Sequence, residues 1–287
     1  MMPGMTVNDD QSAHFARQFY KYGELIHAVH YFDPSLIEEG KAIGYDHYWT
    51  TYFATRMAPM GAADAATTIA VFYGWNAGRI AGTVPEAWAI AGPEQALAAR
   101  LRSAETTLAK VTADLDGAAV AEAAELAWNA SQLIDLPGRA LGAANYALPK
   151  PSSTLGTLWQ ATTTLREHRG DGHNAVLVAH DLGPIEAHLL KTGSGEIDVP
   201  TIQKTRKWSD EDWAAASEKL SSRGLLNTDG TLTESGLALH QEVEDATDRA
   251  ASAPWKALGD EVSARTIEAL KPIGRAAASL GLVPGRR

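Results

Sequence analysis

Residues 224–236 read GLLNTDGTLTESG, and this stretch decides the predicted fold. The Asp229-Gly230 pair lies between two short apolar runs, which is a β-hairpin signal because Asp-Gly accepts the positive φ angles of a tight hairpin turn. A helix is predicted on each side. Residues 209–223 begin at Ser209, a good N-cap, and end before the glycine stop Gly224. Residues 233–251 return to helical periodicity.

Most of the remaining chain also has helical periodicity. Residues 97–111 and 118–134 are rich in Ala, Leu and Glu, with apolar residues three and four positions apart. The sequence therefore predicts a mainly α protein with small β-hairpin wings.

The stretch RGLLNTDGTLTESGLAL (223–239) resembles the wing of MarR-type regulators, in which a GL…LT..G pattern brackets the hairpin. This resemblance covers roughly residues 155–250. The wing, the segment EHRGDGH (167–173), the helix headed by WSDEDW (208–213) and a repeated Ala-Leu-Gly together look like an actinobacterial helix-turn-helix family with tandem MarR-like winged-helix halves. The resemblance implies a fold but no activity.

An internal duplication would explain the repeated Ala-Leu-Gly. Residues 136–145 (LPGRALGAAN) and 253–262 (APWKALGDEV) share a proline, a cation and Ala-Leu-Gly. When the two halves of the chain are aligned on such matches, His27 corresponds to His168. We therefore expect two pseudo-symmetric winged-helix-like halves, a degenerate one at 1–150 and a second at 151–287. By resemblance, the chain would be a single-chain version of a MarR dimer; a pseudo-dimeric monomer and a homodimer both remain open.

The charge of the chain argues against nucleic acid as a partner. The net charge is −10, whereas affinity for DNA depends on cationic contacts to phosphate. Asp210, Glu211 and Asp212 stand at the start of the helix that would read the major groove, where Arg, Lys or Asn is needed. One basic run, KTRKW (204–208), could contact phosphate, although solvated surface also accounts for it. We therefore do not expect DNA to be a partner of this protein.

The composition indicates a cytoplasmic protein with no membrane partner. No apolar stretch approaches the ~18 residues of a membrane span, the first residues (MMPGMTVNDDQS) do not resemble a secretory signal, and the chain contains no cysteine.

The densest polar chemistry lies in EHRGDGH (167–173). We expect one helix to end near Glu167 and another to begin after His173, with Asp171 capping the second across a bend. His168 or His173 could act as a general base tuned by Glu167, which makes these three the catalytic candidates. Arg169 or Arg166 could hold a carboxylate or phosphate. Buried residues that tie two helices together are an equally good interpretation.

Seven of the nine histidines lie in two windows that the duplication would place in equivalent positions. The first window holds His27, His30 and His47, and we expect these to line the same pocket as the second. Its apolar walls would come from aromatic residues that could equally be ordinary core. The predicted ligand-binding residues are Arg169, His27, His30, His47, Trp49, Tyr52 and Trp159.

No cofactor can be assigned from the sequence. Glu24, His27 and His30 are three residues apart on one helix, a spacing that can hold a metal, and one histidine could serve as an axial haem ligand. No fixed metal or haem signature accompanies them. Both cofactors stay open alternatives.

These observations favour a small-molecule binding protein, or an enzyme of specialised metabolism, with a His- and carboxylate-lined pocket between the two halves. The alternative is a MarR-like DNA-binding transcriptional regulator, which would need an exposed positive stripe. A pure interaction scaffold would have no enclosed polar pocket.

Overall fold

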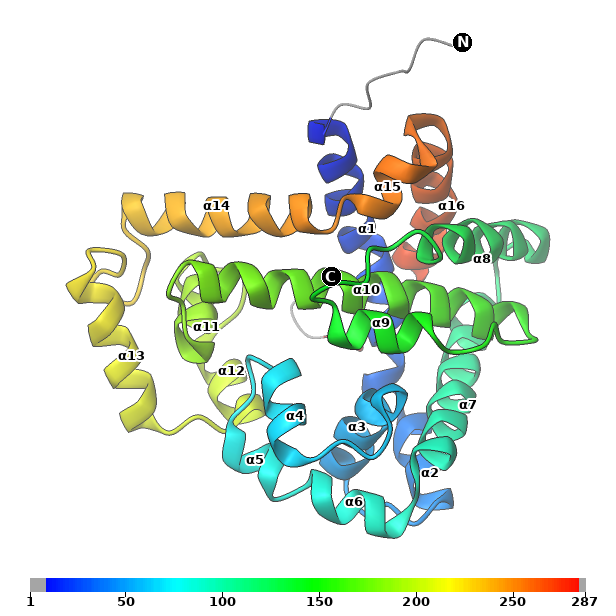
Figure 1. The fold of residues 1–287 in the computed structure, drawn as a ribbon, viewed down its shortest axis with the longest axis horizontal. Helices are drawn as coiled ribbons and strands as arrows, with labels where there is room; N and C mark the ends of the chain where they lie inside the picture. The colour runs from blue at the N-terminus through cyan, green and yellow to red at the C-terminus, as the bar shows by residue number, and fades with distance from the viewer. Residues whose placement is uncertain (1–8, 284–287) are drawn as a thin grey trace.

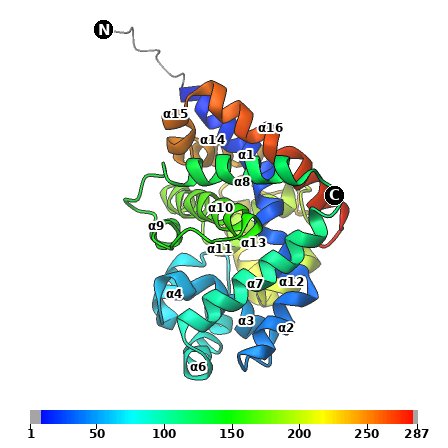
Figure 2. The same ribbon diagram turned by 90° about the vertical axis from the view of Figure 1, so that its right-hand side faces the viewer.

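Helix α10 (Thr154–Ala179) runs through the middle of the molecule, and most of the long helices pack around it (Figures 1 and 2). The structure, a computed structural model, describes residues 9–283. Within this range the chain forms α-helices, two 3-10 helices and no named β-strand. The mainly α fold class is therefore confirmed.

The elements before α10 are α1 (Asp9–Ala28), the 3-10 helix η1 (Val29–Phe32), α2 (Pro34–Ala42), α3 (Tyr48–Met57), the 3-10 helix η2 (Ala58–Met60), α4 (Ala65–Val71), α5 (Ala77–Ala81), α6 (Val84–Ile90), α7 (Pro93–Val111), α8 (Gly117–Ser131) and α9 (Ala140–Tyr146). Those after it are α11 (Pro184–Gly193), α12 (Val199–Arg206), α13 (Asp210–Ser222), α14 (Glu234–Ala250), α15 (Ala253–Leu258) and α16 (Asp260–Ser279).

The helix boundaries follow local capping. Ser209 accepts a hydrogen bond from the Asp212 backbone N–H at 3.0 Å, and Gly224 follows α13 with a φ of 70°, as the sequence predicted for this helix. Ser153 caps α10 in the same way, through the Gly156 N–H at 3.0 Å. The helices predicted at 97–111 and 118–134 are also present, as α7 and α8.

The predicted hairpin is reduced to a single antiparallel bridge. Leu226 pairs with Leu232, and the turn between them is closed by a bond from the Asn227 N–H to the Thr231 carbonyl at 2.8 Å. Gly230 supplies the positive φ, 84°, that the turn requires. The prediction of a turn here was correct, but no strand of a β-wing forms within residues 9–283.

The prediction of a bend at EHRGDGH was wrong, because residues 167–173 lie in the uninterrupted middle of α10. Glycine and aspartate are poor helix formers, each costing up to ~1 kcal/mol relative to alanine. Tertiary packing outweighs that cost. A Cβ on Gly172 would collide with the Arg139 guanidinium, so the glycine allows close approach to the chain before α9. Asp171 accepts from the Gly142 N–H in the first turn of α9 at 2.8 Å and, contrary to the sequence prediction, does not cap a helix that begins after His173.

Three main apolar clusters hold the helices together. The largest contains side chains from α1, α7, α8, α10 and α16, so it draws on both sides of residue 150. A second joins the end of α10 to α11, α12, α13 and α14. A third is formed mainly by α3, α4, α5 and α6. The second and third clusters leave a space between them, against one face of α10.

No helix within residues 9–283 is long and apolar enough to cross a membrane.

Candidate functional site

A cavity of about 580 Å³ opens between the middle of α10 and helices α3, α11 and α12. The segment that follows α4 (71–75) forms another wall. Its lining is more polar than apolar in character and includes four cations, Arg56, Arg166, Lys191 and Arg206. Of the residues predicted for the site, the cavity brings together Tyr52, Glu167 and His173.

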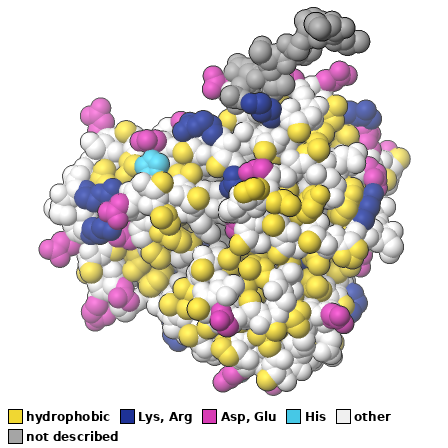
Figure 3. All heavy atoms as spheres, viewed as in Figure 1, with side chains coloured by type: hydrophobic (Ala, Val, Ile, Leu, Met, Phe, Trp, Pro, Cys, Tyr) yellow, Lys and Arg dark blue, Asp and Glu magenta, His cyan; other side chains and the backbone are white. Residues whose placement is uncertain are grey.

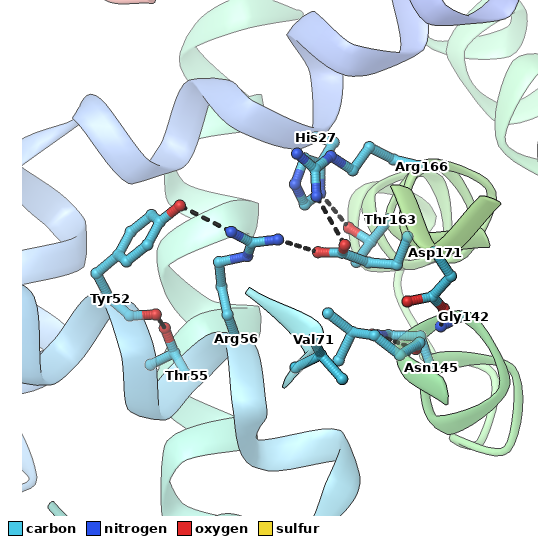
Figure 4. Close-up of polar contacts among 12 residues, drawn as sticks. His27, Tyr52, Thr55, Arg56, Val71, Gly142, Asn145, Thr163, Arg166 and Asp171 are labelled. Atoms are coloured by element: carbon cyan, nitrogen blue, oxygen red, sulfur yellow. Dashed lines mark hydrogen bonds and ion pairs between the residues drawn. The ribbon is translucent and has the colours of Figure 1, made fainter. Parts of the chain in front are cut away.

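A buried ion-pair network forms the wall on the α3 side. Arg56 donates to Oε1 of Glu167 at 2.8 Å and to the Tyr52 hydroxyl at 2.8 Å. Figure 4 shows the Arg56 guanidinium with the Tyr52 hydroxyl on one side of it. Arg166 donates to the other oxygen of Glu167 at 2.7 Å and also pairs with Glu24. Burial disfavours the charged form of Glu167, but Arg166 and Arg56 outweigh it and hold the pKa of Glu167 below its usual value.

Glu167 therefore remains a carboxylate whose two oxygens already bind two cations. A carboxylate in this state has no proton to donate and is a weak acceptor for one. Its geometry suits it to hold Arg56 and Arg166 at the cavity wall.

The two histidines of the cavity are neutral. Burial lowers the pKa of His173 to about 3, and it lowers the pKa of His188 to about 3 as well. His173 Nδ1 lies 2.9 Å from the Thr247 hydroxyl, which itself donates to the Val243 carbonyl at 2.7 Å. His173 must then donate from Nδ1, because the Thr247 hydrogen is already used, and Nε2 is left as an acceptor. His188 donates from Nε2 to the Gly74 carbonyl at 2.8 Å.

Asp171 is the titratable carboxyl of the cavity. Burial raises the pKa of Asp171 to about 6, against the opposing effect of the hydrogen bond from the Gly142 N–H. The carboxyl is therefore ionised only in part near neutral pH.

Arg206 is a cavity cation without a counter-charge in the part of the chain that the structure describes. Within residues 9–283 no carboxylate lies within 4 Å of it, and its Nε has no hydrogen-bond partner. Its guanidinium lies over the Trp75 ring, 3.8 Å from the centroid. Burial lowers the pKa of Arg206, and so does the positive charge of Arg56.

His168 and Arg169 lie outside the cavity lining. His168 is buried, and its Nε2 lies 2.6 Å from Asp135. Arg169 pairs with Asp248 at 2.8 Å and lies over the Tyr20 ring, 4.1 Å from the centroid. Both side chains tie α10 to its neighbours in the fold, as the non-functional interpretation of EHRGDGH expects.

His27 and His30, two of the three histidines of the first window, are part of the core. His27 Nδ1 lies 2.9 Å from the Thr163 hydroxyl, and the Trp159 indole donates to the His27 carbonyl at 3.1 Å. His30 Nδ1 lies 3.3 Å from Ser103, and burial lowers its pKa to about 3. These side chains are outside the cavity lining. Nowhere in residues 9–283 do three or more His, Asp or Glu side chains form a group able to hold a metal ion.

His47 and Trp49 stand apart from that core. His47 is exposed at the start of α3, where its side chain makes no capping bond. Trp49 packs against Trp75 with 5.2 Å between ring centroids, and the Arg79 guanidinium lies over its ring. Trp49 therefore contacts Trp75, which lines the cavity, but does not itself line it.

The sequence analysis missed Arg56 and Lys191 as site residues, and it interpreted Arg206 only as part of a basic run that was solvated or contacted phosphate. One sequence signal could have placed Arg206 inside. It follows the buried Ile202 by four positions, so the two side chains share one face of α12. Lys204, between them, is exposed.

The sequence model of one family, described as a helix-turn-helix family, matches residues 16–284 of this chain. No match was found among curated proteins. None was found among solved structures either.

Proposed function

This chain belongs to the helix-turn-helix family whose model matches nearly all of it, and we propose that it is a small-molecule binding member of that family. The support for binding is a charged cavity that opens beside α12. The cavity is the observation that carries the proposal. Its volume, about 580 Å³, falls in the range of ~300–1,000 Å³ that small-molecule sites occupy.

The side chains support binding better than catalysis. Glu167 is held by two arginines, and a histidine with a pKa of about 3, such as His173, is too weak a base to be an effective proton acceptor at neutral pH. An enzyme of specialised metabolism remains a narrower form of this proposal, and it would need its reactive group from the ligand.

Filling the cavity tests the proposal. Ala187 lines it, whereas Ala175 is exposed on α10, so Ala187→Trp and Ala175→Trp form a matched pair. A library of metabolites is screened by thermal shift against the wild type and both variants. We expect ligands that stabilise the wild type and Ala175→Trp but fail to stabilise Ala187→Trp. A screen in which every hit stabilises all three proteins equally would exclude the cavity as the site.

A DNA-binding regulator is the second candidate, and family membership favours it. Helices α12 and α13 are joined by a three-residue turn, in which Lys207 has a left-handed φ of 63°, and Lys204 and Lys207 are exposed. Acidic side chains gather at the end of the molecule where α13 lies (Figure 3), and Asp210, Glu211 and Asp212 are exposed in its first turn. These carboxylates oppose the approach of a phosphate backbone.

Titration of fluorescein-labelled duplex DNA, followed by anisotropy, tests this candidate. A DNA-binding protein would show affinity that falls steeply between 50 and 200 mM salt and weakens further in the double variant Lys204→Glu, Lys207→Glu. We expect no binding at micromolar protein concentration. A salt-dependent isotherm that the double variant abolishes would instead make DNA binding the leading function.

We further propose that the chain is a single-chain equivalent of a MarR-type dimer with halves at 1–150 and 151–287. The support is that the two Ala-Leu-Gly segments pack in the same way. Helix α9, which carries the first, packs on α10, and α15, which carries the second, packs on α1. The duplication pairs α1 with α10 through His27 and His168. Light scattering should therefore give the mass of one chain, 30.6 kDa. Twice that mass would support the homodimer alternative.

A further inference from the structure

The cations of the cavity exceed the carboxylates available to neutralise them. Glu167 is shared by Arg56 and Arg166, and Arg166 has Glu24 as a second partner. Glu196, a second lining carboxylate, lies 2.7 Å from His240, whose hydrogen bond lowers the pKa of Glu196 to about 2. Asp171, the third, accepts from the Gly142 N–H at 2.8 Å and, among the described residues, forms no ion pair with a cavity cation within 4 Å. The positive charges of Arg206 and Lys191 are left over.

Lys191 reaches the cavity from α11, and within residues 9–283 no carboxylate lies within 4 Å of its ammonium group. Its charge acts on the interior, since it contributes to lowering the pKa of His173 and of His188. The cavity therefore carries two excess cations on two neighbouring helices, α11 and α12.

Arg206 is shaped to receive an anion from the cavity. Trp75 lies against its guanidinium plane, which fixes the group and leaves only its edge for hydrogen bonding. Along that edge Nε has no partner within the described residues. The Tyr52 hydroxyl is a polar neighbour of Arg206 and already accepts from Arg56 at 2.8 Å. Two guanidinium groups thus converge on one hydroxyl.

Arg206 is half-buried and its Nε is buried without a partner, and a desolvated cation in such a place costs free energy unless something neutralises it. We infer that the ligand of the cavity carries a carboxylate or phosphate group, which Arg206 binds through its free edge and Lys191 neutralises further. This inference rests on the proposed small-molecule function and names the class of ligand. The apolar side chains Leu177, Ile197 and Ile202 line the same cavity and would contact the rest of the molecule.

A matched pair of probes isolates the charge of the ligand. Hexanoate and hexanamide have the same carbon chain, and only the first is an anion; inorganic phosphate is a third probe. Each is titrated into the full-length protein by calorimetry and by ¹H–¹⁵N spectra of the arginine Nε–H groups. We expect hexanoate or phosphate to shift the Arg206 resonance saturably, and hexanamide to leave it unchanged. A response to phosphate alone would identify a phosphate-bearing ligand.

Two substitutions of equal charge on α12 provide the control. Arg206→Gln should weaken binding of the anionic probe about tenfold or more, because it removes a charge-assisted hydrogen bond. Lys204→Gln removes a charge two residues away, on the exposed face of the same helix, and should change the affinity less than twofold. Equal losses in the two variants, or equal binding of hexanoate and hexanamide, would overturn the inference.

The unliganded protein gives a second test. If Arg206 is kept for a ligand, Arg206→Met should not lower the unfolding temperature, whereas Arg56→Met should, because it breaks a buried ion pair. A fall in the unfolding temperature of Arg206→Met as large as that of Arg56→Met would make Arg206 a structural residue.

Failure of every anionic probe to bind also overturns the inference. The proposed function survives that result if neutral compounds still bind the wild type and not Ala187→Trp.

Discussion

Arg56 on α3 donates a hydrogen bond to Glu167 on α10 at 2.8 Å, although 111 positions separate them in the sequence, and both side chains are at most 7% exposed. This buried ion pair joins two parts of the molecule that belong to different apolar clusters. It also fixes one wall of the cavity, because Arg56 donates a second hydrogen bond to the Tyr52 hydroxyl.

Loss of Glu167 should destabilise the protein more than loss of Arg56. Glu167→Gln leaves the buried Arg56 and the half-buried Arg166 without their shared carboxylate and should cost about 3–5 kcal/mol of unfolding free energy. Arg56→Met should cost less, because Glu167 keeps Arg166. Glu125→Gln, at an exposed pair with Lys150, is the control and should cost at most about 1 kcal/mol. Urea denaturation measures all three, and the reverse order would show that Arg56 is the dominant member.

Asp171 should make the protein less stable as the pH rises. Its folded pKa, about 6, is above the unfolded value of 3.8, so its contribution is present below pH 3.8 and is lost as the pH passes through 6. Asp171→Asn keeps the acceptor for Gly142 but removes the ionisation. The stability of this variant relative to the wild type should increase by about 2 kcal/mol between pH 4 and pH 7. A constant difference over that range would mean that Asp171 is ionised throughout.

His173 should act in the opposite direction. Its folded pKa, about 3, is below the usual 6.5, so its contribution is present above pH 6.5 and is lost as the pH falls toward 3. Between pH 7 and pH 5 the wild type should lose up to about 2 kcal/mol relative to His173→Gln, which cannot be protonated. Urea midpoints at the two pH values give the comparison. Parallel losses in the two proteins would contradict the buried neutral imidazole.

Gly142 should tolerate no side chain. A Cβ there would lie 2.8 Å from the His168 Cα, so Gly142→Ala must push α9 away from α10 and should cost about 1–3 kcal/mol. Gly117→Ala is the matched control, because a Cβ at Gly117 meets no atom within 4 Å. It should be neutral or stabilising by up to about 1 kcal/mol. Equal denaturation midpoints for the two variants would refute the close contact between α9 and α10.

Local features of the sequence were sufficient for the helices away from the cavity and for the turn at Asp229-Gly230. Capping by Ser209 and the glycine stop at Gly224 act within a few residues, so they can be recognised without knowledge of the rest of the chain. The site was predicted less well. Tyr52, Glu167 and His173 line the cavity, but His27, His30, His47, Trp49, Trp159, His168 and Arg169 do not.

The sequence by itself determined a mainly α chain, because helical periodicity and capping residues are local properties, and its match to a helix-turn-helix family supplied the type. Only the tertiary structure decided that EHRGDGH continues a helix and that Arg206 faces a cavity. Packing of α9 against α10 outweighs the unfavourable helix propensity of Gly170, Asp171 and Gly172. The spacing of Arg206 from Ile202 indicates only an inward-facing side chain. Its position over Trp75, 131 positions earlier in the chain, depends on a long-range contact that leaves no local pattern in the sequence.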